Sequence, residues 1–166
     1  MNDIILQYDR DIFLFLNGLN NPTFDFIMHW ISDTKIWIPF YAVLLFALYK
    51  KYGFKGTVFA AAVVVTVIVI TDQTSVKLFK NVFMRYRPCH NLEIKDMVHI
   101  VYDHCGGKYG FVSSHAANTF GLATIMGLFL RNKMHLFLLL TWAALVSYSR
   151  IYLGVHYPAD ILGGAA

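Results

Sequence analysis

Residues 111–130 read FVSSHAANTFGLATIMGLFL, a stretch without Asp, Glu, Lys or Arg. A helix needs about 20 mostly apolar residues to cross a lipid bilayer, and this stretch meets that requirement alone. Three other uncharged stretches, residues 36–49, 56–71 and 134–149, meet it if flanking aromatic and lysine side chains lie in the headgroup region. The chain is therefore predicted to cross the membrane several times.

The overall composition supports the same prediction. Hydrophobic residues make up 57% of the chain and charged residues only 14%, whereas soluble domains average about 45–50% and about 25%. The net charge of +4 comes from basic residues scattered between apolar stretches rather than gathered on one polar face. We therefore expect membrane lipids, and no nucleic acid, as partners.

The fold class predicted from these stretches is all-α, a polytopic transmembrane helical bundle. Short loops between apolar stretches favour antiparallel neighbours. Helices are expected near residues 34–50, 55–86, 114–131 and 134–153, with another starting at Pro158.

The whole chain, residues 1–166, is predicted to form a single membrane-embedded domain. Residues 1–33 are apolar but broken by polar residues, so we expect an interfacial amphipathic region, followed by the bundle at 34–166. The residues after Asp160 are too few to cross a bilayer, and the last helix is expected to be truncated.

Two short loops are basic, at residues 50–55 and 131–133. An excess of Lys and Arg is typical of cytoplasmic loops. If both loops lie inside, the helices alternate consistently and the long loop 88–112 lies outside. The motifs described next would then lie on the outer face of the membrane.

Three cations stand at the edges of apolar stretches. Lys80 and Arg87 are seven residues apart, so on a helix ended by Pro88 they would share one face and could converge on an anion. Alone, such residues are usually lipid anchors, and Arg85 is expected to contact lipid headgroups. Arg150 strengthens the anion interpretation, because a charge inside a membrane segment normally has a partner or a ligand.

Ser113, Ser114 and His115 open the helix predicted near residues 114–131 and follow a glycine-rich stretch. A serine there is a good helix N-cap, which is a purely structural role. The same helix start also presents free N–H groups and partial positive charge to an anion. His115 would stand beside that site as a proton donor.

His156 and Asp160 are four residues apart, a spacing that stacks them on one helical face. The carboxylate could fix the imidazole tautomer and leave the other ring nitrogen as a nucleophile. Two histidines and a carboxylate also describe part of an iron or zinc site. Three nearby cations would repel a divalent metal while stabilising phosphate charge, so we expect neither metal nor cofactor.

The long loop carries Cys89 and Cys105. A disulfide between them is one possibility if the loop lies outside the cytoplasm. Free thiols, or a metal site shared with the histidines of the loop, are the alternatives.

Together the motifs resemble the type 2 phosphatidic acid phosphatase family, whose motifs read Lys-x6-Arg-Pro, Pro-Ser-Gly-His and Ser-Arg-x5-His-x3-Asp. The first and third match in full, whereas in the second Val112 replaces the proline and Ser114 the glycine. The matching positions are Lys80, Arg87, Pro88, Ser113, His115, Ser149, Arg150, His156 and Asp160.

The resemblance implies a metal-independent phosphatase with a phosphohistidine intermediate. The residue matching His156 would attack phosphorus, that matching His115 would protonate the leaving oxygen, and that matching Asp160 would orient the nucleophile. The phosphate would be cradled by Lys80, Arg87, Ser113, Ser114 and Arg150.

The resemblance also suggests a bacterial inner-membrane enzyme with its site facing the periplasm. Undecaprenyl diphosphate is the substrate we favour from the sequence, with phosphatidylglycerol phosphate and phosphatidic acid as alternatives. A lipid phosphotransferase, a vanadate-dependent haloperoxidase and a phosphate-lipid binding or transport protein are the rival classes. The apolar stretches disfavour the haloperoxidases, which are soluble.

Overall fold

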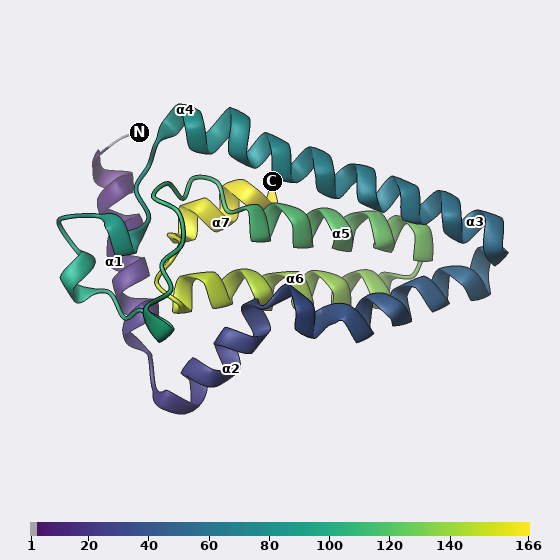
Figure 1. Cartoon of the computed structure of the whole chain (residues 1–166), viewed down its shortest axis with the longest axis horizontal. Coiled ribbons are helices and arrows are strands. Elements are labelled where there is room, and N and C mark those ends of the chain that lie inside the picture. Colours follow the sequence, from purple (N-terminus) through teal and green to yellow (C-terminus); the bar gives the residue numbers. More distant parts are fainter. Residues whose placement is uncertain (1–2) are drawn as a thin grey trace.

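The computed structural model describes residues 3–166, and the described part is helical (Figure 1). In chain order the α-helices are α1 (Asp3–Gly18), α2 (Pro22–Ser32), α3 (Ile38–Thr74), α4 (Asn81–Phe83), α5 (Ser114–Leu130), α6 (Lys133–Tyr152) and α7 (Pro158–Ala165). Shorter helical turns are η1 (Thr34–Trp37), the π-helical η2 (Ser75–Lys80), η3 (Pro88–His90), η4 (Lys95–Met97) and η5 (Val101–Asp103).

Two helical hairpins form the body of the protein. The first is α3 itself, which bends back at Gly53 into two arms, as Figure 1 shows. Gly53 has φ 66° and ψ −175°, a conformation that costs glycine little because it has no Cβ. The two arms correspond to the helices predicted near 34–50 and 55–86. The second hairpin pairs α5 with α6.

The hairpins pack on one another through apolar side chains, three of which are alanines. The buried centre joins both arms of α3 to α5 and α6, and contains Leu48, Ala60, Leu122, Ala123, Met126, Leu139, Trp142, Ala143 and Val146. Alanines at the contact let the helix backbones approach closely, which favours association inside a membrane. Within residues 3–166, the stretches Thr34–Phe83 and Lys133–Tyr152 are long and apolar enough to span a bilayer.

Both basic turns lie at the same end of the bundle. Lys51 Nζ donates a hydrogen bond to the Leu130 carbonyl, and the Tyr52 hydroxyl donates to that of Phe129. The long loop and the α6–α7 connection lie at the opposite end, here called the loop end (Figure 1). This arrangement is the alternation that the charge pattern predicts, while the side of the membrane each end faces stays a prediction.

The second arm of α3 ends earlier than predicted. After η2 and α4 the helix stops at Met84, which adopts left-handed dihedral angles (φ 45°, ψ 34°). The chain then runs extended beside the later part of the loop, with Arg87 N–H donating to Lys108 O at 3.1 Å and Gly110 N–H to Arg85 O at 2.9 Å. Pro88 therefore does not end the helix, and Lys80 and Arg87 do not share a helical face.

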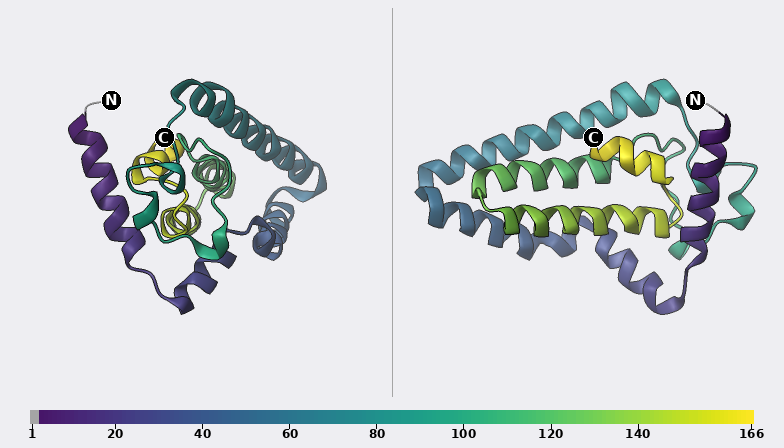
Figure 2. Two further views of the ribbon diagram at one scale, coloured as in Figure 1. Left: turned by 60° about the vertical axis from the view of Figure 1, so that its left-hand side comes forward. Right: turned by 180° about the vertical axis from the view of Figure 1, so that it is seen from behind.

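The first two helices cover the loop end. α1 lies across the ends of the bundle helices, as Figure 2 shows from behind. Its inner face buries Phe13 against Ile151 and Tyr157, and the buried Asn17 amide donates to the Tyr152 carbonyl at 2.8 Å. Its outer face exposes large apolar side chains such as Tyr8, Ile12 and Phe15. An interfacial position for residues 1–33 fits this pattern and stays a prediction.

Candidate active site

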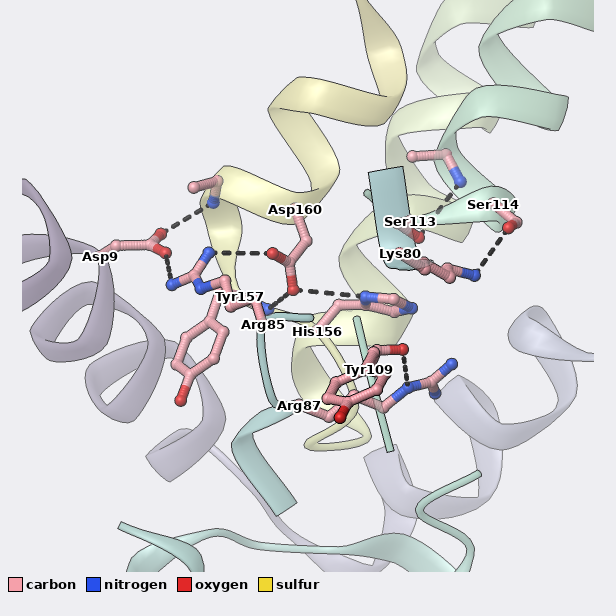
Figure 3. A network of polar contacts seen from close by, with 12 residues as sticks. Asp9, Lys80, Arg85, Arg87, Tyr109, Ser113, Ser114, His156, Tyr157 and Asp160 are labelled. Carbon is pink, nitrogen blue, oxygen red and sulfur yellow. Dashed lines mark hydrogen bonds and ion pairs between the residues drawn. The ribbon is translucent and has the colours of Figure 1, made fainter. Parts of the chain in front are cut away.

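The loop end gathers the side chains of all three motifs around the α6–α7 connection (Figure 3). Lys80 comes from η2 and Arg87 from the segment after α4, while Ser113, Ser114 and His115 stand at the start of α5. Arg150 lies near the end of α6, His156 in the following turn, and Asp160 in the first turn of α7.

His156 and Asp160 form a buried pair, with exposures of 1% and 0%. His156 Nδ1 lies 3.4 Å from Asp160 Oδ2, which also accepts the Tyr157 N–H at 3.0 Å. The prediction that the two residues lie on one helical face is wrong, because α7 begins only at Pro158. They meet because the Asp160 side chain turns back toward the segment before its own helix.

The His156 imidazole is neutral at physiological pH. Burial lowers the pKa of His156 to about 4, although the hydrogen bond and charge of Asp160 act in the opposite direction. With the Nδ1 proton directed at Asp160, Nε2 keeps its lone pair. A neutral ring with an oriented free nitrogen is the form that can act as a nucleophile.

Gly110 closes one side of the pair. A Cβ added there would lie 3.1 Å from Asp160 Oδ2, 3.4 Å from His156 Nδ1 and 3.1 Å from Arg87 Cγ. Gly110 is itself buried. The absence of a side chain at this position therefore lets the loop backbone pack directly against the buried pair.

Three cations lie at the site, and their hydrogen-bond partners are uncharged groups. Lys80 Nζ donates to Ser114 Oγ at 2.8 Å. Arg87 donates to two backbone carbonyls, those of Cys105 at 3.1 Å and Tyr109 at 3.3 Å. Within residues 3–166, neither Lys80 nor Arg87 forms an ion pair with a carboxylate, so neutral groups hold both cations in place.

Arg150 differs from the other two cations in having a buried donor without a partner among the described residues. Its Nη1 donates to Ser32 Oγ, and its buried Nε has no hydrogen-bond partner among the described residues. A buried guanidinium with an unused donor is costly unless a ligand completes it. This unused donor therefore points to an anion that binds here.

The start of α5 provides further donors. Ser113 is the N-cap, and its Oγ accepts the Ala116 N–H at 3.4 Å, so the predicted structural role is present. The Ser113 N–H is occupied by the Asp160 carbonyl at 2.9 Å. In residues 3–166, the N–H groups of Ser114 and His115 have no such partner, which leaves them available to an anion.

His115 lies within electrostatic range of His156 and of all three cations. It also lines two cavities. One, of about 280 Å³, is shared with Arg150 and with His29 and His104. The other, of about 420 Å³, extends between the hairpins and is almost wholly apolar. A polar anion site thus adjoins a space suited to hydrocarbon.

Residues 56–166 match the PAP2 superfamily. This chain belongs to that family. The match begins in the second arm of α3 and includes every motif residue. The family assigned from the motifs is therefore confirmed, and the protein is a PAP2 lipid phosphatase.

Two curated relatives bear the name lipid A 4'-phosphatase. The one from Porphyromonas gingivalis is 39% identical over 99% of this chain and 70% of its own length. The one from Bacteroides thetaiotaomicron is 34% identical over 99% of this chain and 74% of its own length. An undecaprenyl-diphosphatase from Sulfolobus acidocaldarius is 27% identical over 96% of this chain and 72% of its own length.

Two solved structures share the PAP2 fold. A transmembrane phosphatidylglycerolphosphate phosphatase from Bacillus subtilis aligns with a TM-score of 0.76 at 20% identity, covering 99% of this chain and 80% of that one. The Aquifex aeolicus LpxE structure gives a TM-score of 0.67 at 22% identity, covering 93% and 86%. The predicted all-α transmembrane bundle is confirmed, and the PAP2 chain is an integral membrane protein.

One residue of the PAP2 site was wrongly placed by the sequence analysis. Arg85, expected among lipid headgroups, instead forms ion pairs with Asp9 at 2.5 Å and Asp160 at 2.9 Å. Asp9 and Gly110 were not predicted at all. The local spacing could not reveal them, because their partners come from distant parts of the chain.

Cys89 and Cys105 form a disulfide. It ties η3 to the segment whose Cys105 carbonyl accepts from Arg87. Both sulfurs of the Cys89–His90–Cys105 cluster are used in the bond, so the cluster offers no thiolate to a metal. The disulfide thus restrains the part of the PAP2 loop that holds Arg87.

Proposed function

We propose that this protein hydrolyses a lipid phosphate without a metal, through a phosphohistidine formed on His156. The observation that carries the proposal is the neutral, buried His156, oriented by Asp160 and surrounded by cations whose charges are not neutralised. That arrangement suits attack on an anionic phosphate and stabilisation of the charge that develops on it.

The reaction has two balanced steps. First, His156 Nε2 forms a bond to phosphorus while the ester oxygen leaves with a proton from His115. Then water attacks phosphorus, His115 takes a proton from that water, and the N–P bond breaks to release inorganic phosphate. Both histidines return to their starting protonation states.

The phosphate oxygens are held by charges and donors from four elements. Lys80, Arg87 and Arg150 supply the charges, and the free N–H groups at the start of α5 supply directed hydrogen bonds. A divalent cation would be repelled by the same three charges. Phosphate binding and catalysis are therefore expected to be independent of metal.

For the substrate, we propose a lipid that carries a phosphate monoester, with the 4'-phosphate of lipid A as first choice. The two lipid A 4'-phosphatases are 39% and 34% identical to this chain over the aligned residues, against 27% for the undecaprenyl-diphosphatase. Undecaprenyl diphosphate, which we favoured from the sequence, becomes the second choice. The apolar cavity beside His115 would accept the hydrocarbon part of either lipid.

We further propose that the loop end faces the periplasm of a bacterial inner membrane. The basic turns at the opposite end support this orientation. The disulfide also supports it, because disulfides persist in oxidising compartments.

The test is phosphate release by detergent-purified protein from lipid A and from undecaprenyl diphosphate, with and without EDTA. We expect release with EDTA present, faster from lipid A, and none above background for His156→Ala. His135→Ala is the matched control, because His135 is an exposed histidine at the other end of α6.

Mass spectrometry of enzyme quenched during turnover should find an acid-labile phosphoryl group on His156. Loss of activity in EDTA would disprove the metal-free mechanism. Phosphate transferred to an added lipid acceptor instead of water would identify a phosphotransferase.

A further inference from the structure

Arg85 lies at the centre of a buried ion network that joins α1 to α7 (Figure 3). Its Nη1 donates to Asp160 Oδ1 at 2.9 Å and its Nη2 to Asp9 Oδ2 at 2.5 Å. The Arg85 side chain is 15% exposed, and those of Asp9 and Asp160 are 7% and 0% exposed. One guanidinium thus serves two buried carboxylates.

We propose that Arg85 and Asp9 are positioning residues for the nucleophile. Arg85 holds one oxygen of Asp160 so that the other faces His156, and Asp9 fixes Arg85 and the start of α7 together. This inference rests on the proposed role of His156 and extends that site to the N-terminal helix.

The geometry around Asp160 leaves it little freedom. Oδ1 accepts from Arg85, while Oδ2 accepts the Tyr157 N–H and lies 3.4 Å from His156 Nδ1. The Arg85 guanidinium also lies over the Tyr157 ring, 4.1 Å from its centroid. Rotation of the carboxylate would break the contact with Arg85, so this contact sets the orientation of Oδ2.

Asp9, in α1, also contacts the first turn of α7, which carries Asp160. Its second oxygen accepts the N–H of Ala159 at 2.8 Å, and Ala159 directly precedes Asp160. A single side chain of α1 therefore anchors both the guanidinium that pairs with Asp160 and the backbone that carries it.

The network also places a positive charge directly against the Asp160 carboxylate. A buried carboxylate without a cation binds a proton. A protonated Asp160 would donate to Nδ1 of His156 and place the ring proton on Nε2, which would remove the lone pair needed for attack. Because Arg85 binds Oδ1, Oδ2 is left to accept the Nδ1 proton of His156, which is the reactive tautomer.

Charged and titratable groups reach the His156–Asp160 pair from every element around it: Asp9, Lys80, Arg85, Arg87, His115 and Arg150. The Tyr157 hydroxyl instead accepts a hydrogen bond from Asn91 at 3.0 Å. In Figure 3, Arg85 and Asp9 lie on the other side of Asp160 from Lys80 and Arg87. Changes to these two can therefore alter the pair without removing a phosphate ligand.

The experiment measures the pH dependence of kcat/KM for Arg85→Gln, Asp9→Asn and the double variant. Arg85→Gln should lower kcat about 100-fold, because the nucleophile loses its orientation. Loss of the positive charge also makes protonation of the His156–Asp160 pair easier. The acid limb, the fall of kcat/KM at low pH, should therefore move up by about one pH unit. Loss of the negative charge should move the limb of Asp9→Asn to lower pH. The double variant should have its acid limb near that of the unaltered protein.

Three controls separate positioning from a general structural effect. Arg85→Lys keeps the charge and should recover part of kcat with an unshifted acid limb. Arg10 lies next to Asp9 in α1 and pairs at the surface with Glu93 of the long loop, so Arg10→Gln should leave kcat and the acid limb unchanged. The inhibition constant for inorganic vanadate should stay within about threefold in every variant, which would show that the phosphate site remains folded.

An acid limb that stays fixed in both single variants, or that moves the same way in both, would overturn the inference. So would a kcat for Arg85→Gln equal to that of the unaltered protein. Failure of the proposed function would look different, because the unaltered protein would then release no phosphate or would need a metal.

Discussion

Cations of two kinds lie within one small region at the loop end. Arg85 is paired with two carboxylates. Lys80 and Arg150 instead each donate to a serine hydroxyl, and Arg87 donates to two backbone carbonyls. The contrast shows how a buried site can divide its charge. A charge that is neutralised internally can fix the geometry of a nucleophile, and a charge held by neutral groups stays available to an anionic ligand.

Gly110 packs against both Arg87, a cation without an ion pair, and Asp160, the partner of Arg85. Its substitution should therefore have the largest effect. In Gly110→Ala, the new Cβ would press on Asp160 and on Arg87 at 3.1 Å each. Because small displacements of reacting groups are costly, kcat should fall by about 100-fold or more. Steady-state kinetics checks this, with Gly107→Ala as control because its Cβ would meet no atom within 4 Å. Equal activity of the two variants would contradict the packing argument.

The unpaired cations should differ from Arg85 in anion affinity. Arg87→Gln should weaken vanadate inhibition by about 10- to 100-fold, since it removes a charged hydrogen-bond donor. Arg85→Gln should leave that inhibition nearly unchanged while lowering kcat. Inhibition titrations on both variants test the division directly. If both lost vanadate affinity equally, the two kinds of cation would not be functionally distinct.

The pH dependence of kcat/KM tests the state of the nucleophile, His156. Because the pKa of His156 is lowered to about 4, its ring stays neutral down to mildly acidic pH. Activity governed by this group should fall only as pH drops through about 4, whereas an ordinary histidine would lose about 90% by pH 5.5. A kcat/KM profile with an acid limb near 6.5 would show that His156 is not shifted in the working enzyme.

The disulfide should matter more for stability than for chemistry. Cys89 and Cys105 are 16 residues apart, and closing a loop of that size stabilises a protein by about 3 kcal/mol. Replacing both residues by Ser should lower the thermal midpoint clearly. The effect on kcat/KM should be a few-fold, through looser support of Arg87. A loss of activity as large as that of Gly110→Ala would argue for a direct role of the loop.

The smallest effect is expected for Arg10→Gln. Arg10 and Glu93 pair at the surface, with exposures of 35% and 65%, and such pairs contribute about 0–1 kcal/mol. Thermal unfolding and kinetics should both stay close to those of the unaltered protein. Asp9→Asn, one residue earlier in α1, should differ clearly, because Asp9 is buried and contacts both Arg85 and Ala159.

The sequence predicted the parts of this protein that depend on local pattern. Uncharged apolar stretches predicted the helices, and motif spacing grouped His156, Asp160 and Arg150. It failed where a distant contact decides the outcome. Arg85 looked like a lipid anchor because its partner Asp9 lies 76 residues away, and no local signal marks that pairing.

The end of the α3 arm was missed for a related reason. Residues 84–87 continue a helix-like pattern, but Met84 turns left-handed and the chain pairs with residues 108–110 instead. Tertiary contacts of this kind override local propensity. Gly110 was missed because its glycine-rich surroundings suggested only flexibility.

The distant contacts at the loop end also have a consequence for the order of assembly. Each hairpin joins neighbouring segments, so the bundle can form from local contacts. The Asp9–Ala159 contact spans 150 residues. We therefore expect the bundle to form first and the phosphatase to gain a competent nucleophile only when the two distant segments have met.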